Sequence, residues 1–241
     1  MTTIEILMPE VLRLLGIYWG YIIAFALSLI VIRFTVKVPD YIFRKLLHIV
    51  AFTSIFPLLL CTQQWQAAVL VELSFLAVII VGLHFFERFS FYQSLFVEKG
   101  KHEVITSFVM LFSLMTILLA VFWGGFGDAY RYIPGTAIMA WGPGDAAAAI
   151  VGRNWGKHKL SGPHIEGVKS LEGTLAMGVT SFVCTLGTLL WMSPLALGSA
   201  VLISLVIAPI AALVELYTRH GLDTVTVPIA AGIILAVFAI L

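Results

Sequence analysis

Long apolar segments separated by short polar ones make up most of this sequence. A helix needs about 20 mostly apolar residues to cross the hydrocarbon core of a bilayer, and there its backbone hydrogen bonds must be made internally. The segments that meet this criterion are 14–32, 41–60, 65–86, 104–123, 132–151, 174–192, 195–214 and 225–241. The pattern predicts an all-α, polytopic transmembrane helix bundle of about eight spans, forming a single membrane domain over residues 1–241.

The fifth segment is the least regular of these spans. Gly and Pro residues interrupt it, and it contains the acidic residue Asp145, which directly follows Gly142, Pro143 and Gly144. An Asp in that position is a natural N-cap for a short helix. An ionisable group inside a span is costly unless it is used, so a functional role for Asp145 is the alternative interpretation.

Composition supports a membrane location and excludes some functions. Hydrophobic residues make up 61% of the chain and charged residues 11%, with a mean hydropathy of +1.05. The net charge of +1 gives no basic surface for a nucleic acid. Cys61 and Cys184 lie in apolar surroundings, which indicates small buried residues and no disulfide framework. Glu5 and Glu10, with no base among the first twelve residues, do not fit a cleavable signal peptide.

The basic residues predict the orientation. Twelve of the 14 Lys and Arg residues fall in or beside the loops that follow the first, third, fifth and seventh segments. Only Arg13 and Arg131 fall on the other side. Because positively charged loops remain in the cytoplasm, we expect a multi-pass protein of the cell (inner) membrane with both termini outside.

The stretch from Trp141 to Thr174 concentrates glycines, lysines and acids. Glycine lets a backbone approach a ligand closely, lysines attract a polyphosphate, and carboxylates hold the Mg²⁺ that accompanies it. The start of the sixth segment adds the positive end of a helix dipole beside Lys169 and Ser170. The candidate phosphate-binding residues of this stretch are Gly144, Gly152, Gly156, Lys157, Lys159, Lys169 and Ser170.

Several acidic and basic residues at the predicted cytoplasmic face have two interpretations. Glu103, Glu172 and Asp223 lie near the starts of the fourth, sixth and eighth segments, where the helix dipole alone favours acids. With Asp145, they are also candidate Mg²⁺ ligands. The lysines could instead contact anionic lipid headgroups.

One motif order resembles a known family. The order GD-(A)4-IVGRxxGxxK followed by KSxEGTLA is similar to CTP-dependent polyprenol kinases, which include phytol, farnesol and dolichol kinases and CTP-dependent diacylglycerol kinases. Many bacterial members look like phosphatidate cytidylyltransferases. Arg44, Lys45 and His48 match the RKxxH element of the family. Glu103 takes the place of a Gly-Glu segment, and DTVTVP resembles a C-terminal Asp-Asn-Leu-Thr-Val-Pro segment with Thr224 in place of Asn.

The resemblance implies phosphoryl transfer from CTP to the hydroxyl of a membrane lipid alcohol, with Mg²⁺. Arg44 and Lys45 would contact phosphate, and Asp145 or His48 would act as the base. A snorkelling basic collar is the alternative interpretation of Arg44, Lys45 and His48.

Two other functions remain open from the sequence. A CTP:phosphatidate cytidylyltransferase would share the nucleotide, the metal and the membrane location. A secondary transporter with broken helices would fit the Gly-Pro break, although such proteins place their acids near the midplane at a repeat interface, and no repeat is visible here. Glu72, inside the third segment, has no assigned role.

Overall fold

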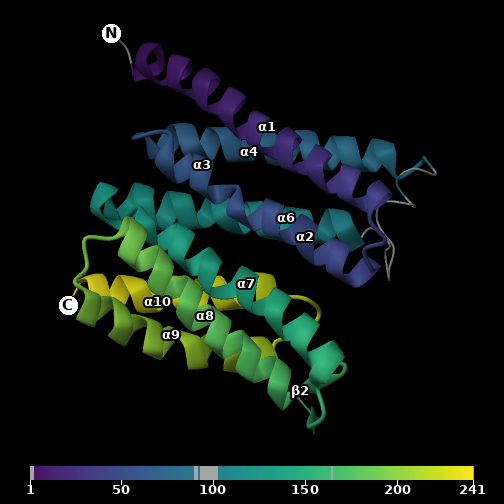
Figure 1. The fold of residues 1–241 in the computed structure, drawn as a ribbon. Coiled ribbons are helices and arrows are strands. Elements are labelled where there is room, and N and C mark those ends of the chain that lie inside the picture. The colour runs from purple at the N-terminus through teal and green to yellow at the C-terminus, as the bar shows by residue number, and fades with distance from the viewer. Residues whose placement is uncertain (1–2, 90–91, 93–102, 164, 241) are drawn as a thin grey trace. The chain divides into compact units, whose positions relative to one another are not determined.

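A computed structural model describes residues 3–89, 92, 103–163 and 165–240. The described chain is all α-helical apart from two very short strands, as the apolar pattern predicts. It forms two compact units, Met1–Gly124 and Gly125–Leu241 (Figure 1). The prediction that the two make a single membrane domain stays a prediction.

The first unit packs its helices around an aromatic core. Its elements are α1 (Thr3–Thr35), α2 (Asp40–Thr53), α3 (Ile55–Leu60), α4 (Trp65–Phe86), α6 (Glu103–Leu118) and the π-helical turn η1 (Leu119–Gly125). Helix α4 packs against both α1 and α6. The Phe75 ring of α4 contacts Tyr18 of α1 at 5.2 Å and Phe112 of α6 at 4.9 Å between ring centroids. These edge-on contacts join the three longest helices of the unit.

The segment predicted as one span over 41–60 is divided at Ser54 into α2 and α3. Pro57 explains the division, because a proline ring inside a helix collides with the carbonyl four residues earlier, here that of Thr53. The Ser54 side chain is fully buried, and its Oγ donates to the Ala51 carbonyl at 2.7 Å.

A buried carboxylate lies in the core of the first unit. Glu72 of α4 is 0% exposed, and neither of its carboxylate oxygens has a hydrogen-bond partner among the described residues. Its neighbour Tyr18 shares a 3.0 Å hydrogen bond with Ser54 Oγ instead. Burial of a polar group without a partner opposes folding.

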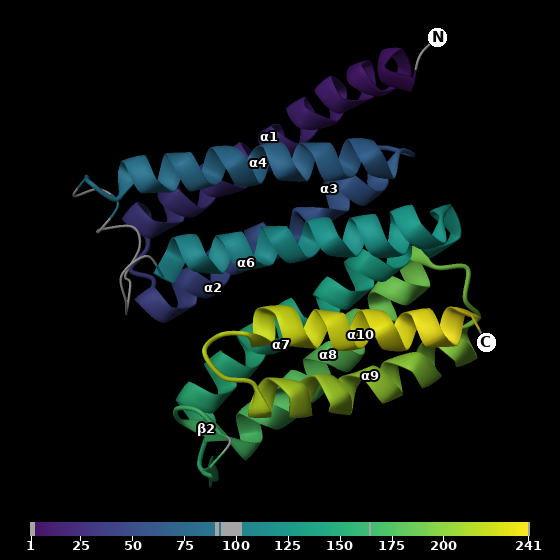
Figure 2. The ribbon, with the colours of Figure 1, turned by 180° about the vertical axis from the view of Figure 1, so that it is seen from behind.

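The second unit is an antiparallel four-helix bundle with a small hairpin at one end. Its elements are η2 (Asp128–Tyr130), α7 (Tyr132–Trp155), β1 (Lys159–Leu160), β2 (Lys169–Ser170), α8 (Leu171–Met192), α9 (Leu197–Tyr217) and α10 (Asp223–Ile240). Helix α7 packs against α8 and α10, and α9 packs against the same two helices. Figure 2 shows α9 and α10 side by side, with α7 and α8 behind them.

Seven helical stretches among the described residues are long and apolar enough to cross a membrane. Helix α7, the irregular fifth segment, is not among them, although its 24 residues extend about 36 Å. It runs without a break through Gly142, Pro143 and Gly144. Half of its residues are buried by neighbouring helices, so its surface does not need the apolarity of a lipid-facing helix.

Helices α7 and α8 approach each other closely where glycines face Ser170. A Cβ atom on Gly156 would lie 2.3 Å from the Gly152 carbonyl oxygen and 2.5 Å from Ser170 Oγ. A Cβ atom on Gly173 would lie 3.0 Å from the Ala148 carbonyl oxygen. Gly156 therefore leaves no room for a side chain, and the space beside Gly173 is tight.

We expect the Glu72→Leu variant to be more stable than the wild type by about 1–3 kcal/mol, because it removes buried acceptors that lack partners. Thermal unfolding of the detergent-solubilised protein measures the change. Glu72→Gln serves as the control, since it keeps polar atoms in the same position and should gain little. A lower unfolding midpoint for the Leu variant would contradict this explanation.

Substituting alanine for glycine should have opposite effects at two positions in the second unit. Gly156→Ala should destabilise by about 1–3 kcal/mol, because its Cβ meets backbone and Ser170. Gly187 lies inside α8, and a Cβ atom added there would have no atom within 4 Å. Gly187→Ala should therefore stabilise the protein by roughly 0.5–1 kcal/mol through its higher helix propensity. Thermal unfolding of both variants in the same detergent tests the contrast, and equal effects would be inconsistent with it.

Candidate functional site

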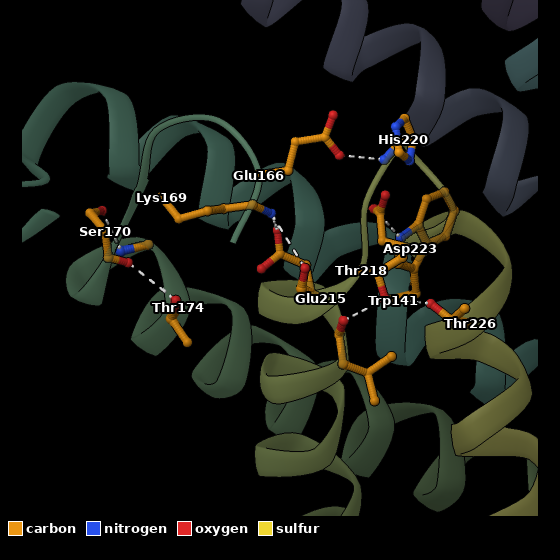
Figure 3. Close-up of polar contacts among 12 residues, drawn as sticks. Trp141, Glu166, Lys169, Ser170, Thr174, Glu215, Thr218, His220, Asp223 and Thr226 are labelled. Carbon is orange, nitrogen blue, oxygen red and sulfur yellow. Dashed lines mark hydrogen bonds and ion pairs between the residues drawn. The ribbon is translucent and has the colours of Figure 1, made fainter. Parts of the chain in front are cut away.

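Hydrogen bonds attach the hairpin segment of the second unit to the turn between α9 and α10. Strands β1 and β2 pair Lys159 with Ser170 and Leu160 with Lys169. The Glu166 carboxylate accepts a hydrogen bond from the backbone N–H of His220 (Figure 3). The Arg219 guanidinium donates to the Pro163 carbonyl. These contacts hold the predicted phosphate-binding stretch against the ends of two other helices.

Lys169 and Glu215 form an ion pair at this end of the bundle. The Lys169 ammonium donates to Glu215 Oε1 and also lies 3.4 Å from the Glu215 carbonyl oxygen. The Glu215 side chain is only 5% exposed, whereas the Lys169 side chain is 28% exposed. Figure 3 shows the lysine extending from the hairpin to the last turn of α9. The cation remains accessible while its counter-ion is buried.

Two further carboxylates lie near this pair. The charges of Asp145, on α7, and of Asp223, at the start of α10, both act on the Glu215 carboxylate. Asp223 Oδ2 accepts a hydrogen bond of 3.1 Å from Trp141 Nε1, and the Trp141 ring is buried (Figure 3). Asp145 is half-buried inside the continuous helix α7. The interpretation of Asp145 as the N-cap of a short helix is therefore wrong.

The start of α8 differs from the predicted anion site. The helix begins at Leu171, three residues before the predicted start, and Ser170 is its N-cap. The buried Ser170 Oγ accepts from the Gly173 N–H at 3.2 Å. The Glu172 carboxylate accepts from the backbone N–H of His158 at 3.2 Å and lies 2.7 Å from His158 Nδ1. Groups of the chain itself thus occupy part of this helix N-terminus.

The other predicted phosphate residues of the second unit fall into two groups. Lys157 and Lys159 are exposed on the hairpin. Gly152 and Gly156 face Ser170, and Gly144 faces Met177 of α8. The structure gives these glycines a packing function, and contact with phosphate stays a prediction for all five residues.

Four predicted site residues belong to the first unit. Arg44, Lys45 and His48 are half-buried on α2, and His48 Nδ1 lies 2.7 Å from the Arg44 carbonyl oxygen. Glu103 begins α6, and its side chain lies outside the described part of the chain. Their predicted functions stay predictions.

Sequence reasoning did not identify Glu215 and Trp141 as site residues. The seventh predicted span ends at Val214, and the sequence gives Glu215 no predicted role. Trp141 enters the prediction only as the first residue of the glycine-rich stretch. The available signals were an acid at the end of an apolar run just before the Asp223 segment, and a tryptophan adjoining Gly-Pro-Gly-Asp.

Among the described side chains, no three His, Cys, Asp or Glu residues are grouped closely enough to hold a metal ion alone. Of the predicted metal ligands, Glu172 contacts His158, whereas Asp145 and Asp223 both lie near Glu215. Mg²⁺ commonly binds through one or two carboxylates together with substrate phosphates and water. Asp145 and Asp223 provide oxygen donors of that kind.

Comparison with known proteins gives one informative match. The chain is 35% identical over 142 residues to a phytol kinase of the cyanobacterium Synechocystis sp.. The match covers 56% of this chain, and the chain spans about half (54%) of the length of that relative. It confirms the resemblance to polyprenol kinases predicted from the sequence motifs. No protein-family model and no solved structure matches the chain.

Proposed function

We propose that this chain, similar over part of its length to a phytol kinase, is a membrane-embedded lipid-alcohol kinase. It transfers a phosphoryl group from CTP to a polyprenol-type alcohol such as phytol. The observation that carries the proposal is the partly exposed Lys169 side chain, which pairs with Glu215 at one end of a helix bundle where the charges of Asp145 and Asp223 also act. A cation next to metal-binding oxygens is the arrangement that phosphoryl transfer requires.

The lysines bind the triphosphate in this proposal. Lys169 contacts the phosphates directly, and the exposed Lys157 and Lys159 on the hairpin attract the nucleotide electrostatically. Ser170 contributes mainly by capping α8, which fixes the position of the neighbouring Lys169.

Asp145 and Asp223 would hold Mg²⁺, which would neutralise charge on the phosphates of CTP. The hydrogen bond from Trp141 fixes the orientation of the Asp223 carboxylate. Asp145 is the candidate base in this unit, which accepts the proton of the lipid hydroxyl as that oxygen attacks the γ-phosphorus and CDP leaves.

Seven helical stretches with membrane-spanning length and apolarity support the membrane location. In this proposal the site lies at the cytoplasmic face of the inner membrane and both termini lie outside, as the distribution of Lys and Arg favours. A water-soluble nucleotide and a lipid alcohol can meet at such an interface.

Product analysis tests the proposed reaction. Purified protein receives CTP, Mg²⁺ and separately phytol, farnesol, a longer polyprenol, diacylglycerol or phosphatidate, and the products are identified by mass spectrometry. We expect a lipid monophosphate and CDP from a polyprenol-type alcohol. Formation of a CDP-lipid and pyrophosphate from phosphatidate would instead establish a cytidylyltransferase. Absence of nucleotide turnover with every lipid would overturn the enzyme proposal.

Lys169→Ala should lower kcat/KM for the nucleotide roughly 100-fold, because it removes a cation that stabilises charge on the transferring phosphate. Lys37→Ala is the matched control, since Lys37 is an exposed lysine of the first unit with no proposed function. Turnover measured with both variants in the same detergent tests the assignment. Equal kcat/KM values for the two variants would show that Lys169 takes no part in the reaction.

A further inference from the structure

The Lys169–Glu215 pair has a geometry that a simple surface ion pair lacks. Both described contacts of the ammonium are with one residue, the carboxylate and the carbonyl oxygen of Glu215. A lysine ammonium has three N–H donors, so these contacts leave a third donor. The Lys169 side chain is 28% exposed, so the lysine is partly open to solvent.

Electrostatics also hold the ammonium in this position. Glu215 is in the last turn of α9, where the negative end of the helix dipole favours a cation. The negative charges of Asp145 and Asp223 also act on the Glu215 carboxylate. A buried Glu215 without Lys169 would be a third negative charge beside two others, which is unfavourable in a poorly hydrated environment.

We propose that Glu215 is a positioning residue for phosphoryl transfer. It holds the Lys169 ammonium by two of its donors and directs the third toward a phosphate oxygen of the bound nucleotide. Glu215 does not itself contact the reacting atoms. The inference rests on the proposed function, because it assigns a role within that phosphate site.

A purely structural ion pair leads to different expectations. If the pair only stabilised the bundle, its loss would weaken folding and ligand binding together. A positioning residue has separable effects. Removing its negative charge strengthens the attraction between this region and a polyphosphate, whereas removing its acceptor atoms leaves Lys169 poorly aligned during the reaction.

Two substitutions separate charge from geometry. Glu215→Gln keeps an acceptor oxygen for Lys169 and removes the charge, whereas Glu215→Ala removes both. Tripolyphosphate binding to the purified, solubilised protein is measured by calorimetry, and turnover is measured with CTP and the alcohol identified as substrate. Glu10→Gln and Glu10→Ala are matched controls, because Glu10 is a glutamate that forms an ion pair with Arg13 in the first unit and has no proposed function.

We expect both Glu215 variants to bind tripolyphosphate at least about threefold more tightly than the wild type, because one negative charge near the ligand is gone. Glu215→Ala should lower kcat by at least about tenfold, since a small misplacement of a positioned group is costly, and Glu215→Gln should stay within about threefold of the wild type. The Glu10 variants should leave both quantities unchanged.

Weaker tripolyphosphate binding by both Glu215 variants, or wild-type kcat in Glu215→Ala, would overturn the positioning role. The binding measurement does not depend on catalysis, so the two proposals fail in distinguishable ways. A wild-type protein that binds tripolyphosphate without turning over CTP would refute the kinase proposal, and the Kd values of the variants would still decide the role of Glu215. A wild-type protein that does not bind tripolyphosphate would overturn both.

Discussion

The second unit depends on one constraint, which is that a helix with polar groups and glycines must be covered by other helices. Helix α7 contains Asp145 and a Gly-Pro-Gly sequence, and its composition would be unfavourable against lipid. Helices α8, α9 and α10 pack against it, and half of its residues are buried. The glycines of α7 and α8 allow this coverage at close range, because a side chain at Gly156 or Gly173 would collide with backbone atoms.

That packing also determines where the candidate chemistry lies. The Ser170 side chain fills the space beside Gly152 and Gly156 and also caps α8. These two contacts fix the backbone position of the preceding residue, Lys169. The ammonium then reaches the last turn of α9, and Trp141 of α7 reaches Asp223 of α10. Each of these contacts satisfies a charged or polar group that would be unfavourable alone in an apolar bundle. Stability and the proposed phosphate site therefore use the same groups.

The first unit follows the same physical rules with a different outcome. Proline divides its second predicted span at Ser54, and an aromatic cluster joins α1, α4 and α6. Glu72 is buried in this core without a hydrogen-bond partner among the described residues. The similarity to a phytol kinase covers part of the chain.

The sequence by itself determined the all-α membrane-type fold, the approximate positions of the helices and the resemblance to polyprenol kinases. Long apolar runs and local motifs are properties of contiguous residues, so they can be read without coordinates. It also indicated Asp145, Lys169 and Asp223 as residues of interest. It did not show that α7 is one continuous helix, because its Gly and Pro residues favour interruption in isolation and only neighbouring helices offset that tendency.

Only the tertiary structure determined the partners of the charged groups. From the sequence, Glu172 is predicted to bind a metal ion and Glu215 has no predicted role. In the structure, Glu172 contacts His158, and Glu215 contacts Lys169, which is 46 positions away. Trp141 and Asp223 are 82 positions apart and still share a hydrogen bond. Pairings of this kind depend on how helices cross and how far each extends. The crossing angles and separations of the helices are set by side-chain packing between segments that are remote in sequence.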